Sequence, residues 1–133
     1  MMIADTNLFI YSVLPENIWL REWFEAEAPS ASVISYVEAI GFHRHTPADK
    51  AALDTLFART ERLRVDDAVI EEAVRLKQMR RMKLGDSLIA ATALVHGLTL
   101  ATRNTDDFAW IPNLSLVDPF EQQPKSQPNE GGA

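Results

Sequence analysis

The apolar positions of this chain fall into short runs and into longer stretches with helical spacing. The short runs predict strands over residues 2–4, 32–34, 62–65, 98–102 and 114–117. The helical spacing predicts helices over residues 8–14, 15–27, 34–42, 46–60, 66–76 and 83–97. The chain begins with a strand, a polar turn and a helix, which is how an open α/β sheet begins.

The last of these helices carries an acid at the start of its apolar face. From Asp86, the positions at helical spacing are Ile89, Ala90, Ala93, Leu94 and Gly97. A carboxylate that faces a core is unfavourable unless it is hydrogen-bonded, protonated or bound to a metal ion. Asp86 could equally cap the helix, although Ile89 stands where a capping box has Glu or Gln. The helix alone leaves both interpretations open.

A second acid, Glu38, lies within the apolar stripe of the helix predicted over residues 34–42. The other members of the stripe are Ile34, Val37, Gly41 and Phe42. A glutamate in the middle of a helix cannot be explained as an N-cap. We therefore expect Glu38 to face inward, where its charge needs a partner.

Polar residues also follow two of the predicted strands. Asp5 and Asn7 come after the first strand, and a run from Asn104 to Asp107 follows the strand at 98–102. In an open α/β sheet, ligands bind at the carboxyl ends of the strands. Both groups could instead shape a turn or cap a helix, because Asp and Asn readily bond to nearby backbone groups.

Composition narrows the class of protein. With 133 residues, 47% of them hydrophobic, the chain can form one domain with its own core. It has no cysteine, which excludes disulfides and a thiol nucleophile and suits a cytoplasmic location. No apolar run is long enough for a membrane span, and the first residues lack the features of a signal peptide. The net charge of −6 excludes a generally basic surface for nucleic acid.

Positive charge gathers in one place, just before Asp86. The cluster comprises Arg75, Lys77, Arg80, Arg81 and Lys83. Basic residues at a helix C-terminus are favoured by the helix dipole and usually form a solvated face. Because they adjoin a candidate acidic site, we also expect Arg80, Arg81 and Lys83 to contact substrate phosphates.

Four acids from distant segments therefore have positions that call for an explanation: Asp5, Glu38, Asp86 and Asp107. Without cations such a cluster would repel itself and take up protons, so its stability at neutral pH implies bound metal. Oxygen ligands favour Mg²⁺ or Mn²⁺, since the chain has no cysteine and its neighbouring histidines lack the spacing of a zinc helix. Such a site supports hydrolysis of a phosphodiester.

Four segments together resemble the PIN-domain nucleases and, within them, the VapC-type toxins of toxin–antitoxin pairs. The segments read IADTN, SYVE, LGDSLIAATA and GLTLATRNTDDF. The likeness extends from Met2 to about Phe120, and the order and spacing of the segments carry it. It implies a Rossmann-like three-layer α/β/α domain over residues 1–120 with a central parallel sheet. Residues 121–133 would follow as a tail, whose polar composition predicts disorder.

The resemblance also implies an Mg²⁺- or Mn²⁺-dependent endoribonuclease, which is inhibited by a small VapB-type antitoxin and usually assembles as a homodimer. Asp5 and Asp86 match the principal metal ligands, and Glu38 would support the metal or the water. Asp107 matches the fourth acid better than its neighbour Asp106. The polar residues expected to orient carboxylates or phosphate are Thr6, Asn7, Thr102 and Asn104.

The predicted helix over residues 15–27 is the candidate contact for the antitoxin, because it carries Trp19, Trp23 and Phe24. Packing in the core would explain the same aromatic residues. Two other functions compete with the nuclease. A PIN domain kept only as a binding module would not need all four acids. A phosphatase of the haloacid-dehalogenase type needs an acid two residues after Asp5, where this chain has Asn7.

Overall fold

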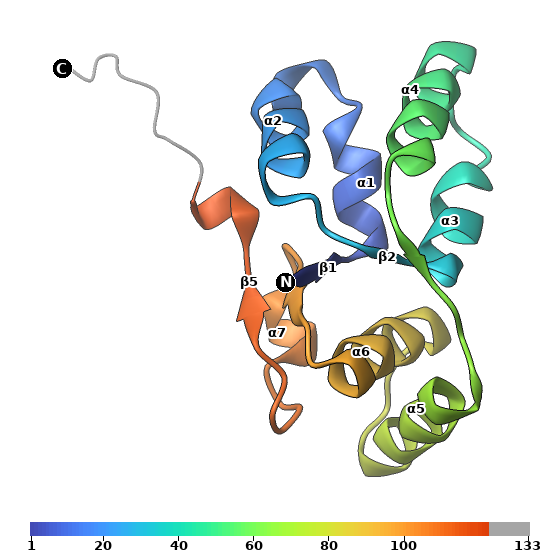
Figure 1. The fold of residues 1–133 in the computed structure, drawn as a ribbon, viewed down its shortest axis with the longest axis vertical. Helices are drawn as coiled ribbons and strands as arrows, with labels where there is room; N and C mark the ends of the chain where they lie inside the picture. The colour runs from blue at the N-terminus through green and yellow to red at the C-terminus, as the bar shows by residue number, and fades with distance from the viewer. Residues whose placement is uncertain (123–133) are drawn as a thin grey trace, which may run out of the picture.

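The computed structural model describes residues 1–122 (Figure 1). Its strands are β1 (Met2–Ala4), β2 (Ala31–Ser32), β3 (Arg62–Leu63), β4 (Thr99–Ala101) and β5 (Leu116–Val117). Its α-helices are α1 (Thr6–Ser12), α2 (Ile18–Glu27), α3 (Val33–Ile40), α4 (Pro47–Ala58), α5 (Asp67–Met79), α6 (Leu84–His96) and α7 (Thr105–Phe108). Two short 3₁₀ helices are η1 (Pro15–Asn17) and η2 (Pro119–Glu121).

All the strand pairs are parallel. β4 pairs with β1 on one side and with β5 on the other, and β2 pairs with β3. A parallel bridge between Ile3 and Ser30 joins the two groups of strands in the order β3-β2-β1-β4-β5. The chain thus leaves β1 in one direction and later returns to its other side. In such a sheet the point where the direction reverses, here between the ends of β1 and β4, is where ligands bind.

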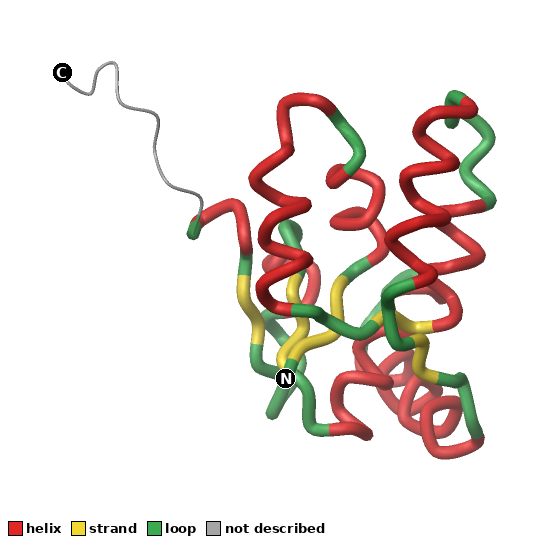
Figure 2. The backbone as a smooth tube through the Cα atoms, turned by 45° about the horizontal axis from the view of Figure 1, so that its top comes forward, coloured by secondary structure: helices red, strands yellow, loops and turns green. Residues whose placement is uncertain are grey.

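The sheet has an apolar core on each of its faces. Successive residues of a strand point to opposite faces. Ile3 and Leu100 therefore pack with α5, α6 and α7, whereas the next residues, Ala4 and Ala101, pack with α1 to α4. Figures 1 and 2 show the two groups of helices on opposite sides of the strands. The predicted three-layer α/β/α fold with a parallel sheet is confirmed.

Several helix boundaries follow local signals in the sequence. Thr46 Oγ1 accepts a hydrogen bond from Asp49 N at 3.1 Å before α4, and Asp66 Oδ1 accepts one from Val69 N at 3.0 Å before α5. Gly97 ends α6 in the left-handed conformation, with a φ of 65°. Each signal acts within about one turn of chain, which is why the sequence predicts these ends well.

Two predicted elements have different boundaries. The strand expected over residues 32–34 ends at Ser32, whose Oγ accepts a hydrogen bond from Ile34 N at 3.1 Å and so begins α3. The helix expected over residues 15–27 starts as η1 and becomes α-helical only at Ile18. In the first case a serine cap starts a helix inside a run that its hydropathy predicts as one strand.

The aromatic residues of α2 pack within the domain. Phe24 is only 4% exposed and belongs to the core, so the expectation that it contacts an antitoxin is wrong. Trp19 packs edge-on against Phe120, with 4.9 Å between the ring centroids. Trp23 packs in the same way against Phe24, at 5.2 Å. The core interpretation of these residues therefore accounts for most of their apolar surface.

The domain boundary predicted after residue 120 falls within η2. Glu121, the first residue of the expected tail, still belongs to η2, where Asp118 Oδ1 accepts a hydrogen bond from Phe120 N at 2.9 Å. The disorder predicted for residues 123–133 lies outside the described residues. Among the helices formed by residues 1–122, none combines the length and apolar character that a membrane crossing requires.

Candidate active site

Asp5 lies at the switch point of the sheet. It directly follows β1, and its backbone N–H donates a hydrogen bond to the Ala101 carbonyl at 2.9 Å. Its Oδ2 accepts a hydrogen bond from Thr102 Oγ1 at 2.9 Å, and the residue is 5% exposed. Asp5 occupies the N-cap position of α1, but its side chain makes no capping hydrogen bond. The Asp5 carboxylate is therefore held by Thr102, the residue after β4, and does not cap α1.

Glu38 reaches the same edge from α3. Thr6, the first residue of α1, donates a hydrogen bond from Oγ1 to Glu38 Oε1 at 2.6 Å. The Thr6 hydroxyl also lies 2.9 Å from the buried Ser35 Oγ, one turn earlier on α3. The start of α1 thus holds the Glu38 carboxylate in one position. Ser35 stands in the segment SYVE, but nothing in the sequence pattern indicated a separate role for it.

The start of α6 packs against the Glu38 carboxylate at Gly85. A Cβ atom at Gly85 would lie 2.5 Å from Glu38 Oε2, closer than real Cβ contacts allow. The next residue, Asp86, lies in the first turn of α6, whereas the N-cap is Lys83. The interpretation of Asp86 as a helix cap is therefore wrong. The missing side chain at Gly85 therefore leaves room for the Glu38 carboxylate in its present position.

The charges of these acids act on one another. Burial is the main cause that raises the pKa of Asp5 to about 6, and the charges of Asp86 and Glu38 raise it further, against the hydrogen bond from Thr102. Burial also raises the pKa of Asp86, as do the charges of Asp107 and Glu38, whereas Lys83 lowers it. The acid that follows β1 and the acids of α3, α6 and α7 are therefore near enough for their charges to act on Asp5 or Asp86.

This donor set fits a divalent cation in its chemistry. The ion pairs within residues 1–122 are Lys50–Asp54, Arg59–Glu25 and Arg75–Glu72, so none of them neutralises the four acids. Carboxylate oxygens are the ligands that Mg²⁺ and Mn²⁺ prefer. In the same residues, no three acidic or histidine side chains are arranged closely enough to enclose an ion. Binding would therefore require these carboxylates to move closer together.

Comparison with known proteins places the chain in a family. The family described as "PIN domain" matches residues 2–113. The chain belongs to the PIN-domain family. It is 32% identical over 129 residues to "Ribonuclease VapC4" from Mycobacterium tuberculosis (strain ATCC 25618 / H37Rv), a match that covers 86% of this chain and 94% of the relative.

Solved structures with the same fold agree with this PIN-domain assignment. A toxin–antitoxin complex from Klebsiella pneumoniae includes a chain that is 28% identical, with a TM-score of 0.73 and coverage of 90% of this chain and 98% of that chain. DNA-bound VapBC from Salmonella typhimurium includes one with a TM-score of 0.76, covering 88% of this chain and 96% of that chain. Its identity of 23% supports the fold alone.

The side of α3 that is buried differs from the prediction. The stripe that contains Glu38 was expected to be buried, but Val37 is 67% exposed and Phe42 is 38% exposed. The buried residues of α3 are Ser35 and Ala39. Because α3 has apolar residues on more than one face, hydropathy did not decide which face would meet α1. Glu38 nevertheless reaches the acid cluster, through its contact with Thr6.

Of the remaining predicted residues, Thr102 is buried and bonded to Asp5, whereas the others are exposed. Thr102 Oγ1 accepts a hydrogen bond from Asn104 N at 3.0 Å while it donates to Asp5. Asn7, Asn104, Asp106 and Asp107 are exposed. Of the two neighbouring acids, it is Asp107 whose charge raises the pKa of Asp86. This favours Asp107 as the fourth acid, which stays a prediction.

The basic residues before α6 are exposed as expected. Arg80 and Arg81 lie in the loop that joins α5 to α6, and Lys83 is the N-cap residue of α6. None of the ion pairs within residues 1–122 includes them. Three positive charges that form no ion pair within residues 1–122 therefore precede Asp86 in the chain, and the charge of Lys83 lowers the pKa of Asp86. Their contact with phosphates stays a prediction.

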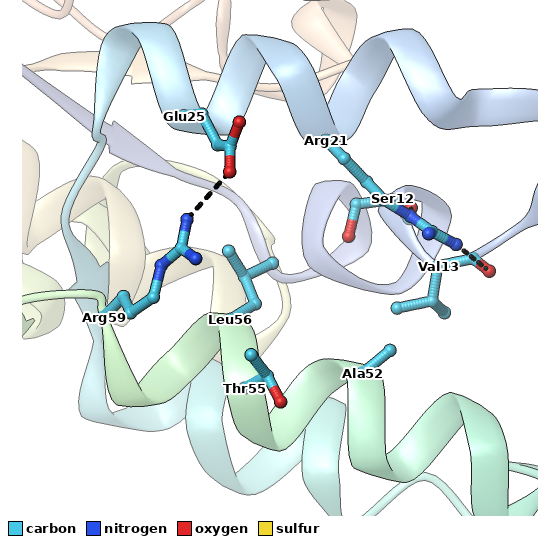
Figure 3. Close-up of a pocket in the computed structure, with 8 residues that line it drawn as sticks. All are labelled: Ser12, Val13, Arg21, Glu25, Ala52, Thr55, Leu56 and Arg59. Carbon is cyan, nitrogen blue, oxygen red and sulfur yellow. Dashed lines mark hydrogen bonds and ion pairs between the residues drawn. The ribbon is translucent and has the colours of Figure 1, made fainter.

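A separate cleft of about 260 Å³ opens between α2 and α4, away from the acids. Figure 3 shows its lining: Ser12, Val13, Arg21, Glu25, Ala52, Thr55, Leu56 and Arg59. The ion pair between Arg59 Nη2 and Glu25 Oε2, at 3.0 Å, spans the two helices. The cleft contains none of the four clustered acids, so it is separate from the candidate active site.

We expect Gly85→Ala to lower catalytic activity by about tenfold or more without loss of stability. The new Cβ would displace the Glu38 carboxylate, and changes to residues that orient metal ligands typically cost about 10- to 100-fold. Alanine is also the better helix former, by up to about 1 kcal/mol. Cleavage rates and thermal unfolding of the variant test both expectations.

A double-mutant cycle provides the control for Gly85→Ala. If the substitution acts by displacing Glu38, it should have little further effect in a Glu38→Ala background. Equal losses of activity in the two backgrounds would mean that Gly85 acts elsewhere.

Proposed function

We propose that this PIN domain is a metal-dependent endoribonuclease that acts as the toxin of a toxin–antitoxin pair. One observation carries the proposal: carboxylates from four segments lie near enough for their charges to act on Asp5 or Asp86, and no positive side chain forms an ion pair with them within residues 1–122. The match to a relative named Ribonuclease VapC4 supports the reaction class. The solved toxin–antitoxin complex from Klebsiella pneumoniae supports the biological role.

Asp5 and Asp86 would hold the divalent cation, with Glu38 and Asp107 on either side of them. When bound, Mg²⁺ or Mn²⁺ would neutralise charge on the scissile phosphate and lower the pKa of the attacking water. Thr102 keeps one oxygen of Asp5 in place by its hydrogen bond. Such a fixed orientation matters because a ligand that turns freely binds metal poorly.

Glu38 is the candidate to accept a proton from the attacking water. Its Oε1 already accepts a hydrogen bond from Thr6, and Oε2 faces Gly85 at the start of α6. Glu38 is exposed, so water can approach it. A fixed, solvent-accessible carboxylate beside the reacting phosphate has the properties of a general base.

The substrate strand would approach from the basic side of the cluster. Arg80, Arg81 and Lys83 would contact phosphates, and the exposed side chains of Asn7 and Asn104 would orient the strand near the acids. The net charge of the chain is −6, so attraction of RNA depends on this local group of positive charges. Cleavage should accordingly weaken steeply as salt is added.

The proposed protein partners are a VapB-type antitoxin and a second copy of this chain. Trp19 and Trp23 are half-buried, so they can offer only part of their surface to an antitoxin. The cleft between α2 and α4 is lined by other residues of α2, Arg21 and Glu25, and provides a further concave surface (Figure 3). We therefore still predict that the antitoxin contacts α2.

The test is to incubate antitoxin-free protein with total bacterial RNA in Mg²⁺, in Mn²⁺ and in chelator, and to sequence the new RNA ends. We expect discrete ends that require metal, because a selective toxin cuts few sites. Total RNA is used because a selective enzyme can ignore an arbitrary oligonucleotide. If folded protein that binds Mn²⁺ produces no new ends, the ribonuclease proposal is wrong and a binding module becomes the better interpretation.

A further inference from the structure

A cation and an aromatic ring meet beside the proposed active site. The guanidinium carbon of Arg80 lies 5.5 Å from the centre of the Trp110 ring. Arg80 is exposed, and no ion pair within the described part of the chain includes it. Its charge is therefore held by a ring rather than by a carboxylate. This arrangement leaves the guanidinium accessible to another charged or aromatic group.

The loop that carries Arg80 is held in place at several points. Arg80 N–H donates a hydrogen bond to the Leu76 carbonyl at 3.2 Å. Lys77 Nζ donates one to the Met82 carbonyl at 2.8 Å. The Met82 side chain packs against the core under α5 and α6. Because these contacts order the loop before any ligand binds, little conformational entropy would be lost on binding.

Trp110 connects this pair to the acids. Its indole Nε1–H donates a hydrogen bond to the backbone carbonyl of Asp107 at 3.0 Å. Asp107 in turn is close enough for its charge to act on Asp86. The loop also leads directly to Lys83, whose charge acts on Asp86 too. Both residues of the Arg80–Trp110 pair are therefore connected to the acid cluster. Trp110 is connected through its hydrogen bond to Asp107, and Arg80 through the loop that leads to Lys83.

We propose that Arg80 and Trp110 form a stacking platform for one nucleobase of a single-stranded RNA, next to the phosphate that is cut. The inference rests on the proposed ribonuclease function and deepens it. A guanidinium that lies over an indole has a second planar face, and nucleobases stack on such faces in single-stranded RNA complexes. Stacking of this kind accepts any base, so the platform would position the strand rather than read its sequence.

The test compares two strands of equal length and charge, in an Asp86→Asn background that binds without cutting. One is a short fluorescent oligoadenylate, and the other is the same ribose-phosphate chain without bases. We expect the parent to prefer the strand with bases by about tenfold. Arg80→Lys keeps the charge but removes the plane, so it should lose most of this preference. Arg64→Lys, a control at an exposed arginine outside the aromatic contact, should retain it.

Three results would overturn the platform. Arg80→Lys could keep the full preference for bases, or it could lose affinity equally for both strands, which would indicate a phosphate contact only. The parent could also show no preference for bases. RNA cleavage by the unaltered protein together with any of these results rejects the platform alone. A lack of cleavage in total RNA rejects the proposed function itself.

Discussion

Asp86→Asn should lower RNA cleavage by at least about a hundredfold and leave the fold intact. Asp86 is half-buried in the first turn of α6. Burial, with the charges of Asp107 and Glu38, raises its pKa. Its carboxylate thus interacts with the charges of the other acids and forms no salt bridge within residues 1–122. Replacing residues that only orient a metal ligand costs about 10- to 100-fold, so removing a ligand itself should cost at least the upper value.

Initial cleavage rates at saturating Mg²⁺, together with circular dichroism and Mn²⁺ binding, measure this effect. Asn has nearly the same shape as Asp, so a loss of activity with an unchanged spectrum reports on charge. Asp67→Asn is the matched control, because Asp67 is an exposed acid in the first turn of another helix, α5. If Asp86→Asn cleaves as fast as the parent, Asp86 is only a structural residue.

Asp5→Asn should abolish activity and at the same time stabilise the metal-free protein. Burial and the neighbouring acids raise the pKa of Asp5 from 3.8 to about 6. At about 1.4 kcal/mol per pH unit, ionisation of this buried group destabilises the fold by about 3 kcal/mol at neutral pH. Asn carries no charge, and its amide oxygen can still accept the hydrogen bond from Thr102.

The pH dependence of stability makes this prediction specific. Below pH 3.8 the Asp5 carboxyl is protonated in the folded and the unfolded chain, so parent and variant should differ little. As the pH rises from 3.8 to about 6, the unfolded chain loses the Asp5 proton first. The unfolding free energy of the parent should therefore decrease across this window relative to that of the variant.

Urea unfolding in chelator at pH 4 and pH 7.5 measures the difference. Addition of Mn²⁺ at pH 7.5 should stabilise the parent more than Asp5→Asn, since binding to the folded state adds to its stability. The control is again Asp67→Asn, which changes an exposed carboxylate. A parent that is as stable as Asp5→Asn in chelator at pH 7.5 would show that the buried charge is already compensated.

Local signals account for what the sequence predicted correctly. The caps at Thr46 and Asp66 and the left-handed Gly97 depend on contacts within about one turn of chain. The position of Asp5 directly after an apolar strand is also a local signal. The same kind of signal was ambiguous for Asp86, because a cap and an inward acid have the same sequence pattern. Only the start of α6 at Leu84 decided between them.

The sequence by itself determined which residue types stand at strand ends and helix starts, and these pointed to the four acids, while its resemblance to the PIN-domain nucleases predicted the fold class. Only the tertiary structure decided how they meet. The hydrogen bond from Thr102 to Asp5 joins residues 97 apart in the chain, and it exists because β4 lies beside β1. The contact of Gly85 with Glu38 likewise depends on how closely α6 approaches α3. Strand order and helix packing arise from burial summed over the whole domain, which no local stretch of sequence specifies.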